Sequence, residues 1–191
     1  VVLSMLATPP LAALAYRLVT ERNSESEATT LAVAAPAMIV ILGFGRVGRR
    51  VGEIFEKRGV SYVAIDNNAG LVKRERDVGR SVFYGDARLP DVLRSLDVEG
   101  AALIIVTVDD FKATEQVVST LHRMSPELNI LARGHDMEHC KRLQEKGARV
   151  AVSENLEASI ALAQSALVQF GIDEVENDEA IARYRKEYYK R

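Results

Sequence analysis

Three glycines in the spacing Gly-x-Gly-x-x-Gly are the clearest chemical feature of this sequence. Gly43, Gly45 and Gly48 follow the apolar run 38–42, which is typical of a buried strand, and they open a stretch with helical periodicity. In such a turn the first glycine permits the tight turn, the second lets the backbone approach a pyrophosphate, and the third lets the helix pack close to the strand. The helix N-terminus would then offer amide groups to the phosphates. The pattern predicts a dinucleotide-type phosphate site, with a tight turn that holds no ligand as the alternative.

An acidic residue supports the ligand interpretation. Asp66 ends a second apolar run, 61–65, about 20 residues after the glycine turn, where a dinucleotide fold places the acid that accepts hydrogen bonds from the adenosine ribose. A carboxylate at this position would repel a 2′-phosphate. The sequence therefore favours NAD(H) over NADP(H).

Further polar residues follow the other expected strands. Arg46 lies inside the glycine turn and could pair with a phosphate; the alternative is a solvated arginine. Asp86 follows the third strand, and Thr107 and Asp109 follow the fourth. Because the carboxyl ends of parallel strands meet at one edge, these side chains are expected near the ligand. Helix capping is the alternative for the two aspartates, and the two roles are compatible for Asp86.

Two histidines and a cysteine could have marked a metal site. His135 and His139 are four residues apart, with Cys140 adjacent, and this spacing can begin a zinc site. The sequence offers no third ligand and no His-Glu-x-x-His pattern. We therefore expect a solvated helix face and no metal.

The elements that must position these residues alternate between strand and helix from Met38 onward. This alternation predicts an α/β fold, a Rossmann-like, doubly wound parallel sheet of six strands with helices on both faces. Strands are expected at 38–42, 61–65, 81–84, 102–107, 129–132 and 149–152, and helices at 46–58, 69–77, 89–95, 111–123, 136–146 and 155–170. Each helix is preceded by an expected cap or turn, at Asn67–Asn68, Asp86, Asp109–Asp110 and Ser153 or Asn155.

Composition limits the classes of function. The chain has 191 residues, a net charge of −2 and a pI near 6.0, so no basic excess indicates nucleic acid. Its single cysteine excludes an internal disulfide and fits a reducing compartment. The nucleotide fold uses residues 37–152, which leaves no length for the substrate domain of a dehydrogenase. A nucleotide site without such a domain indicates a sensor rather than an enzyme.

The two ends of the chain differ from the middle. Residues 1–19 are apolar and 20–36 form a polar linker; the first segment is either the end of a membrane helix or a soluble helix buried against a partner. The helix 155–170 is apolar around much of its girth, so we expect a dimerisation helix spanning 153–171 that crosses to a second subunit. The alternative is a last helix packed on its own sheet. The polar tail 172–191 is expected to hold a solvated terminal helix, with contact to anionic lipid or a neighbouring subunit as the alternative.

Several of these motifs together resemble a known family. The run Gly43–Gly48, Asp66, the run Val82-Phe83-Tyr84-Gly85-Asp86-Ala87 and the run Leu131–Arg133 resemble the RCK (TrkA-N) domain of bacterial Kef-type potassium/proton antiporters, over residues 38–170. Residues 4–9 are similar to the last membrane helix of that family, which would make 1–19 the end of that helix.

The resemblance implies a regulatory domain on the cytoplasmic face of the bacterial inner membrane. It would dimerise through the 155–170 helix, bind NAD(H) or AMP, catalyse no reaction, and gate an antiporter domain upstream on the same chain. Two alternatives are a peripheral NAD-binding subunit of a potassium uptake channel and a small NAD-dependent oxidoreductase. The candidate cofactor-binding residues are Gly43, Phe44, Gly45, Arg46, Val47, Gly48, Asp66, Asn67, Asp86, Ala87, Thr107 and Asp109.

Two positions depart from the glutathione-regulated members of that family. Those members resemble one another in an Arg-x-Arg-Asp run where this chain has Arg133-Gly134-His135-Asp136, and they carry arginine where it has Glu53. A glutathione carboxylate would lose cationic partners here. We therefore expect nucleotide sensing rather than glutathione gating, with His135 as a hypothetical source of pH sensitivity.

Overall fold

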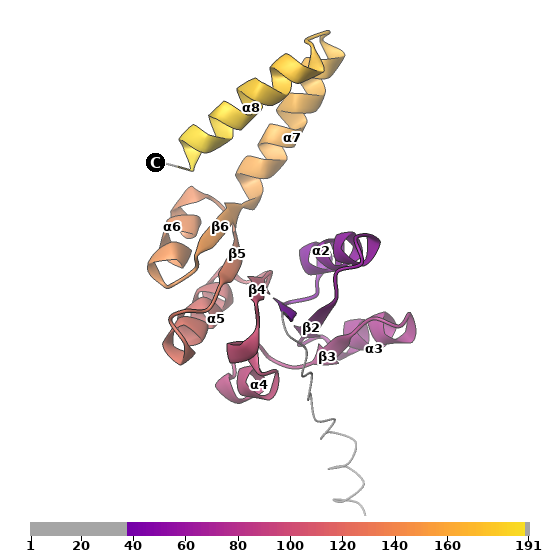
Figure 1. The fold of residues 1–191 in the computed structure, drawn as a ribbon, viewed down its shortest axis with the longest axis vertical. Coiled ribbons are helices and arrows are strands. Elements are labelled where there is room, and N and C mark those ends of the chain that lie inside the picture. Colours follow the sequence, from indigo (N-terminus) through magenta and orange to yellow (C-terminus); the bar gives the residue numbers. More distant parts are fainter. Residues whose placement is uncertain (1–37, 190–191) are drawn as a thin grey trace, which may run out of the picture. The chain divides into compact units, whose positions relative to one another are not determined.

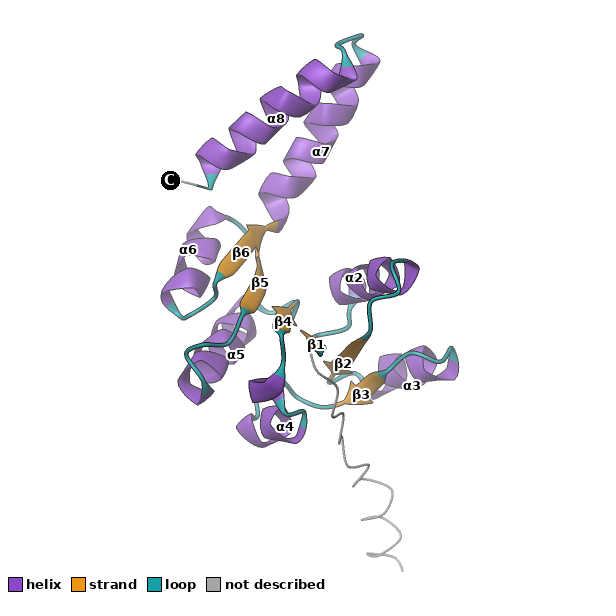
Figure 2. Ribbon diagram, in the orientation of Figure 1, coloured by secondary structure: helices purple, strands orange, loops and turns teal. Residues whose placement is uncertain are grey.

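The structure is a computed structural model that describes residues 38–189. Figures 1 and 2 show a sheet with helices on both of its faces and two further helices after the last strand. The strands are β1 (Ile39–Leu42), β2 (Tyr62–Asp66), β3 (Val82–Tyr84), β4 (Leu103–Val106), β5 (Ile130–Gly134) and β6 (Val150–Ser153). The helices are α2 (Arg46–Lys57), α3 (Ala69–Asp77), α4 (Pro90–Ser95), α5 (Phe111–Met124), α6 (Met137–Glu145), α7 (Glu154–Gln169) and α8 (Glu174–Tyr188), and a 3-10 turn spans Val98–Gly100.

The six strands form one parallel sheet in the order β3-β2-β1-β4-β5-β6. Helices α2 and α3 lie on one face, and α4, α5 and α6 lie on the other (Figure 1). The strand order reverses between β1 and β4, which pair with Ile39 opposite Leu103. This is the doubly wound arrangement that the sequence predicts. The glycine turn directly follows β1, so it lies at the point where the strand order reverses.

The central strands are covered on both faces. Val40, Ile41 and Leu42 of β1 are fully buried, which agrees with the continuous apolar run that predicted such a strand. The edge strand β6 alternates instead: Ala151 and Ser153 are buried, whereas its two valines are exposed. One face of the sheet is therefore open at β6.

Local capping explains most of the helix starts. The side chains of Asn68, Asp110 and Ser153 accept hydrogen bonds from the first turns of α3, α5 and α7. Asp86 does not cap α4, which begins at Pro90 after Leu89 with no side-chain cap bond. Its carboxylate instead accepts the Arg88 N–H at 3.0 Å, in a turn that precedes the helix. Proline suits the first position of α4 because its missing N–H would have no helical partner.

The structure excludes one of the two arrangements expected for the helix after β6, the one packed along its own sheet. In α7 only the side chains near its start, Leu156 and Ile160, are buried, so α7 does not pack along its own sheet. The terminal helix expected in the tail 172–191 is present as α8, and it is partly packed on α7 rather than fully solvated. Arg185 of α8 pairs with Glu157 of α7 at 3.0 Å, and the two helices lie side by side (Figure 2).

In residues 38–189, no helix has both the length and the apolar character needed to cross a bilayer. The predicted membrane-helix end at 1–19 and the linker at 20–36 fall outside the described residues.

Candidate functional site

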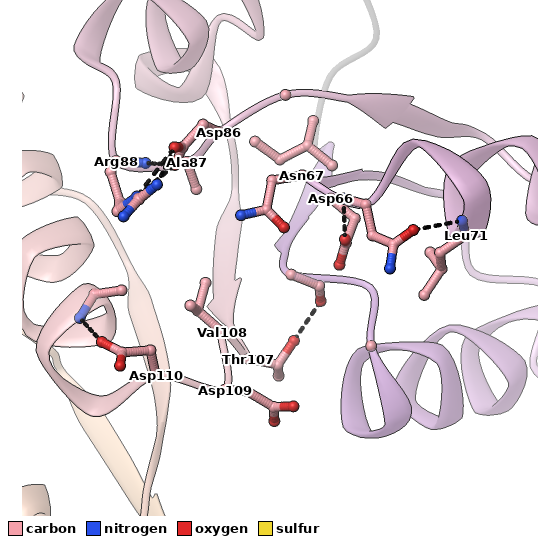
Figure 3. Close-up of a pocket in the computed structure, with 16 residues that line it drawn as sticks. Asp66, Asn67, Leu71, Asp86, Ala87, Arg88, Thr107, Val108, Asp109 and Asp110 are labelled. Atoms are coloured by element: carbon pink, nitrogen blue, oxygen red, sulfur yellow. Dashed lines mark hydrogen bonds and ion pairs between the residues drawn. The ribbon is translucent and has the colours of Figure 1, made fainter.

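A crevice of about 500 Å³ opens where the strand order reverses. Figure 3 shows acidic side chains that reach it from three strand ends: Asp66 is the last residue of β2, Asp86 follows β3, and Asp109 and Asp110 follow β4. Its volume lies in the range typical of small-molecule sites, and open α/β sheets bind ligands at this place. The predicted residues that line it are Gly43, Gly45, Asp66, Asn67, Asp86, Ala87, Thr107 and Asp109.

The glycine turn is held tightly against β4. Gly43 has a φ of +91°, and a Cβ atom there would stand 2.9 Å from the Val108 nitrogen. The Thr107 hydroxyl donates a hydrogen bond to the Gly43 carbonyl at 2.6 Å. A Cβ atom on Gly48 would collide with that carbonyl and lie 2.8 Å from the Thr107 hydroxyl oxygen. The turn and the close helix packing predicted for these two glycines are thus confirmed.

The middle glycine, by contrast, is surrounded by open space. No atom lies within 4 Å of the position that a Cβ on Gly45 would take. Gly45 is also the residue before α2, which has no side-chain cap bond and no acidic residue in its first turn. An anion can therefore approach the backbone here and meet the positive end of the helix.

Asp66 links the turn to the end of β2. One carboxylate oxygen accepts the Phe44 N–H at 2.7 Å, and the other accepts the Asn68 N–H at 2.8 Å. A carboxylate oxygen can accept more than one hydrogen bond. Asp66 is therefore fixed in place and can still accept hydroxyl groups of a ribose.

Two of the other acidic side chains, Asp86 and Asp109, are paired with arginines. Asp86 and Arg88 form a bidentate pair, with a shortest distance of 2.6 Å, and the hydrogen bonds from Arg88 hold the pKa of Asp86 below its usual range. Asp109 lies 2.8 Å from Arg133 and 3.9 Å from Arg46. Neighbouring arginines thus compensate the charges of two of the crevice carboxylates, Asp86 and Asp109.

Four predicted residues do not line the crevice. The Phe44 side chain is buried and stacks on Tyr62 with ring centroids 5.8 Å apart, so Phe44 faces the crevice side only through its N–H. Val47 and Gly48 lie in the first turn of α2, behind the glycine turn. Arg46 is exposed and reaches the crevice through Asp109.

Other lining residues were not among the candidates. They are Ile65, Asn68, Leu71, Gly85, Arg88, Val108, Asp110 and Ala113. Asn68 was expected as a cap, and Asp110 either as a cap or beside Asp109 at the ligand-facing edge; both residues are caps and also line the crevice. Arg88 had one sequence signal, its place two residues after Asp86, which lets the side chain fold back onto the carboxylate. The apolar residues have no such signal, because only the fold brings them to this edge.

The histidine pair does not form the solvated helix face that the spacing predicted. His135 precedes α6, and its ring stacks on Phe111 with centroids 4.6 Å apart. His139 is buried beside Cys140, and its Nδ1 accepts the His135 N–H at 3.1 Å. Burial lowers the pKa of His139. Across residues 38–189, no group of three or more His, Cys, Asp or Glu side chains is placed to hold a metal ion.

Comparison with known families decides the membership of this chain. The family model described as the TrkA-N domain matches residues 39–154. The chain belongs to the TrkA-N domain family. The resemblance carried by the glycine turn and by the Val82–Ala87 run is thereby confirmed.

This TrkA-N chain is 31% identical, over 185 residues, to the glutathione-regulated potassium-efflux system protein KefC of Cronobacter sakazakii. The match covers 97% of this chain and 30% of that protein. The TrkA-N chain thus spans less than a third of the length of this relative.

Solved structures agree on the fold. The Kef C-terminal domain of Shewanella denitrificans in its AMP-bound form superposes with a TM-score of 0.68 at 24% identity, over 78% of this chain and 91% of that one. The GsuK channel bound to NAD gives a TM-score of 0.64 at 20% identity, over 80% of this chain and 28% of that one. At these identities the likeness establishes the Rossmann-like architecture.

Proposed function

We propose that this chain is the cytoplasmic nucleotide-sensing domain that regulates a potassium/proton antiporter of the bacterial inner membrane. The observation that carries the proposal is the crevice itself: a TrkA-N glycine turn open at Gly45 and facing the fixed carboxylate of Asp66. The relationship to a potassium-efflux protein supports the transport context. In this proposal the antiporter domain lies upstream on the same chain, with 1–19 as the end of its last membrane helix, 20–36 as the linker and 37–152 as the sensing domain.

The proposed ligand is NAD(H) or AMP. Relatives of the same fold have been solved with AMP and with NAD. In this chain Asp66 would accept the ribose hydroxyls, and the backbone at Gly45 with the N-terminus of α2 would hold the phosphate. Arg46 would add a cation at the phosphate. Asp86, compensated by Arg88, would border the adenosine.

The proposed role is regulatory and not enzymatic. A binding crevice is sufficient for a sensor, which needs only a difference in ligand affinity between two conformations. Nucleotide binding would favour one arrangement of a dimer, and the linker would transmit that arrangement to the membrane helix. The second candidate function, a peripheral subunit of a potassium channel, is supported by the likeness to the GsuK channel. This candidate would be favoured if the chain regulated a channel that is expressed as a separate polypeptide.

The proposed dimer forms through α7, as residues 153–171. Leu162 and Phe170 leave 73% and 84% of their surfaces exposed, and the open face of β6 exposes Val150 and Val152. Apolar side chains exposed together are typical of an association surface. A second copy would cover them in an isologous contact.

The decisive experiment is calorimetric titration of the full chain with AMP, NADH, NAD and NADPH. We expect at least one ligand without a 2′-phosphate to bind, and NADPH to bind at least tenfold more weakly because Asp66 repels its phosphate. Gly45→Asp should abolish binding. Gly59→Asp is the control for the added charge, since Gly59 is also free of neighbours within 4 Å but lies at the other end of α2. Its φ of +67° lies in the left-handed region, which Asp enters more readily than most residues, and thermal unfolding must show that this variant is folded.

A folded protein that binds none of the four ligands would overturn the proposal. Hydride transfer to any substrate would favour the oxidoreductase instead. If binding is found, potassium efflux from vesicles that carry the whole transporter should respond to the same ligand in the parent protein and not in the Gly45→Asp variant.

A further inference from the structure

Four charged side chains connect the crevice to the base of α7. In order they are Arg46, Asp109, Arg133 and Glu154, and each lies within 4.0 Å of the next. We call this set the charge chain. Asp109 lines the crevice and Arg46 reaches it through Asp109, whereas Glu154 is the first residue of α7.

Arg133 is the central member and the most enclosed one. It lies on β5 with its side chain 11% exposed, and its Nη2 donates to Asp109 Oδ1 at 2.8 Å. Its Nη1 lies 3.3 Å from Glu154 Oε2. Because Arg133 pairs with Val152 in the sheet register, the residue that begins α7 is brought to its side. One guanidinium thus holds a carboxylate of the crevice and a carboxylate of the helix.

Of the two end contacts of the charge chain, Arg46–Asp109 on the crevice side is weaker than Arg133–Glu154 on the helix side. Arg46 Nη2 lies 3.9 Å from Asp109 Oδ2, and the two side chains are 88% and 63% exposed. Solvent screens such a pair strongly. A ligand phosphate at the start of α2 would be a better acceptor for Arg46 than Asp109 is.

The contacts on the helix side are few and local. Ser153 caps the first turn of α7, and the Asn155 N–H donates to the His135 carbonyl at 3.2 Å. Beyond Ile160 the helix has no buried residue. A change in the Arg133–Glu154 pair therefore acts on the short segment that sets the direction of α7.

We propose that the charge chain couples occupancy of the crevice to the position of α7, with Arg133 as the positioning residue that connects them. When a phosphate takes Arg46, Asp109 pairs with Arg133 alone, and the Arg133–Glu154 contact weakens. This inference rests on the proposed function, namely that the crevice binds a nucleotide. By linkage, the nucleotide weakens the Arg133–Glu154 contact by the same factor as that contact weakens nucleotide binding, so removing the contact must raise the affinity.

The test uses AMP titration of the full chain, with NADH in its place if AMP does not bind. Glu154→Gln should raise the affinity about two- to fivefold, the range of exposed ion pairs, because Arg133 then withdraws Asp109 from Arg46. Glu157→Gln is the matched control. Glu157 lies one turn further along α7, carries the same charge and pairs with Arg185 of α8, outside the charge chain; its variant should bind like the parent.

Two further results complete the test. In an Asp109→Asn background, Glu154→Gln should no longer change the affinity, because the chain is already broken. Hydrogen exchange in the first turn of α7 should change on ligand binding in the parent protein and stay unchanged in Asp109→Asn. Thermal unfolding of every variant confirms that it is folded.

The outcomes separate the two proposals. If the parent binds ligand but Glu154→Gln has the same affinity, or if Glu157→Gln shifts the affinity equally, the charge chain does not couple the sites and the proposed function stands. If the parent binds neither ligand, the proposed function fails, and the coupling fails with it.

Discussion

At the scale of single residues, the glycine turn leaves almost no room for a side chain at Gly48 and ample room for one at Gly45. Gly48→Ala should destabilise the protein by about 1–3 kcal/mol, as overpacking does, because its methyl group would collide with the Gly43 carbonyl and press on the Thr107 hydroxyl. Urea unfolding measures the loss. A variant as stable as the parent would contradict the close packing.

Gly45→Ala is the matched variant for the same measurement. Its methyl group meets no atom within 4 Å, so the stability should fall by less than about 1 kcal/mol, the scale of a helix cap exchange. Nucleotide affinity should nevertheless fall at least tenfold, because the methyl group occupies the approach of the phosphate. Affinity equal to that of the parent would place the phosphate elsewhere.

His139 should make the stability depend on pH. Burial lowers its pKa from the ordinary 6.5, although Glu115 at 3.9 Å partly opposes this effect. As the pH falls through 6.5 the unfolded chain therefore takes up more protons than the folded one, and the free energy of unfolding decreases. Urea unfolding at intervals from pH 7.5 to pH 5 should show the decline.

His139→Asn supplies the comparison for that series. An asparagine oxygen can replace Nδ1 as the acceptor of the His135 N–H, but it does not titrate in this range. The decline between pH 7 and pH 5 should be smaller in the variant. Identical slopes in both proteins would mean that other groups cause the pH dependence.

At the scale of elements, the start of α7 depends on one hydroxyl. The Ser153 Oγ accepts the Leu156 N–H at 3.3 Å, and the Ser153 hydroxyl donates a hydrogen bond to the His135 carbonyl at 3.4 Å. Ser153→Ala should lower the free energy of unfolding by about 1 kcal/mol, the usual value of an N-cap. Ser159→Ala, on the same helix, removes an exposed hydroxyl that bonds only to the Asn155 carbonyl of its own helix. It should change the stability by less than about 0.5 kcal/mol.

At the scale of the whole molecule, the apolar residues exposed on α7 predict the oligomeric state. Phe170→Ser should convert the proposed dimer into monomers, because it removes a large apolar side chain from the contact. Light scattering after size-exclusion chromatography measures the mass. Leu89→Ser removes an exposed apolar side chain before α4 and should leave the dimer intact. A monomeric parent protein would contradict the proposed dimer.

Ligand binding should also stabilise the fold as a whole. A nucleotide present at 100 times its dissociation constant adds about 2.7 kcal/mol to the free energy of unfolding. For a domain of this size that corresponds to a rise in Tm of about 5–10 °C. Differential scanning calorimetry with AMP and with NADH would record it, and Gly45→Asp should show no rise.

Much of the architecture follows from local patterns, and these are readable in the sequence. The apolar run of β1, the glycine spacing and the caps Asn68 and Ser153 each act within a few residues of chain. Local propensity and the long-range packing agree here. The alternation of strand and helix predicts a parallel sheet with helices on both faces, so the acidic strand ends, including Asp66, could be expected at one edge.

The pairings among side chains were decided only by the tertiary structure. Asp86 was expected as a possible cap but pairs with Arg88, His139 was expected on a solvated face but lies in the core, and Arg133 joins two carboxylates from separate strand ends. Sequence spacing fixes which residues share an element, whereas burial and ion pairing depend on which other elements pack against it. The sequence by itself therefore determined the sheet, the glycine turn and the acid at the end of β2. Only the packing of β5, β6 and α7 decided how the crevice is connected to the rest of the molecule.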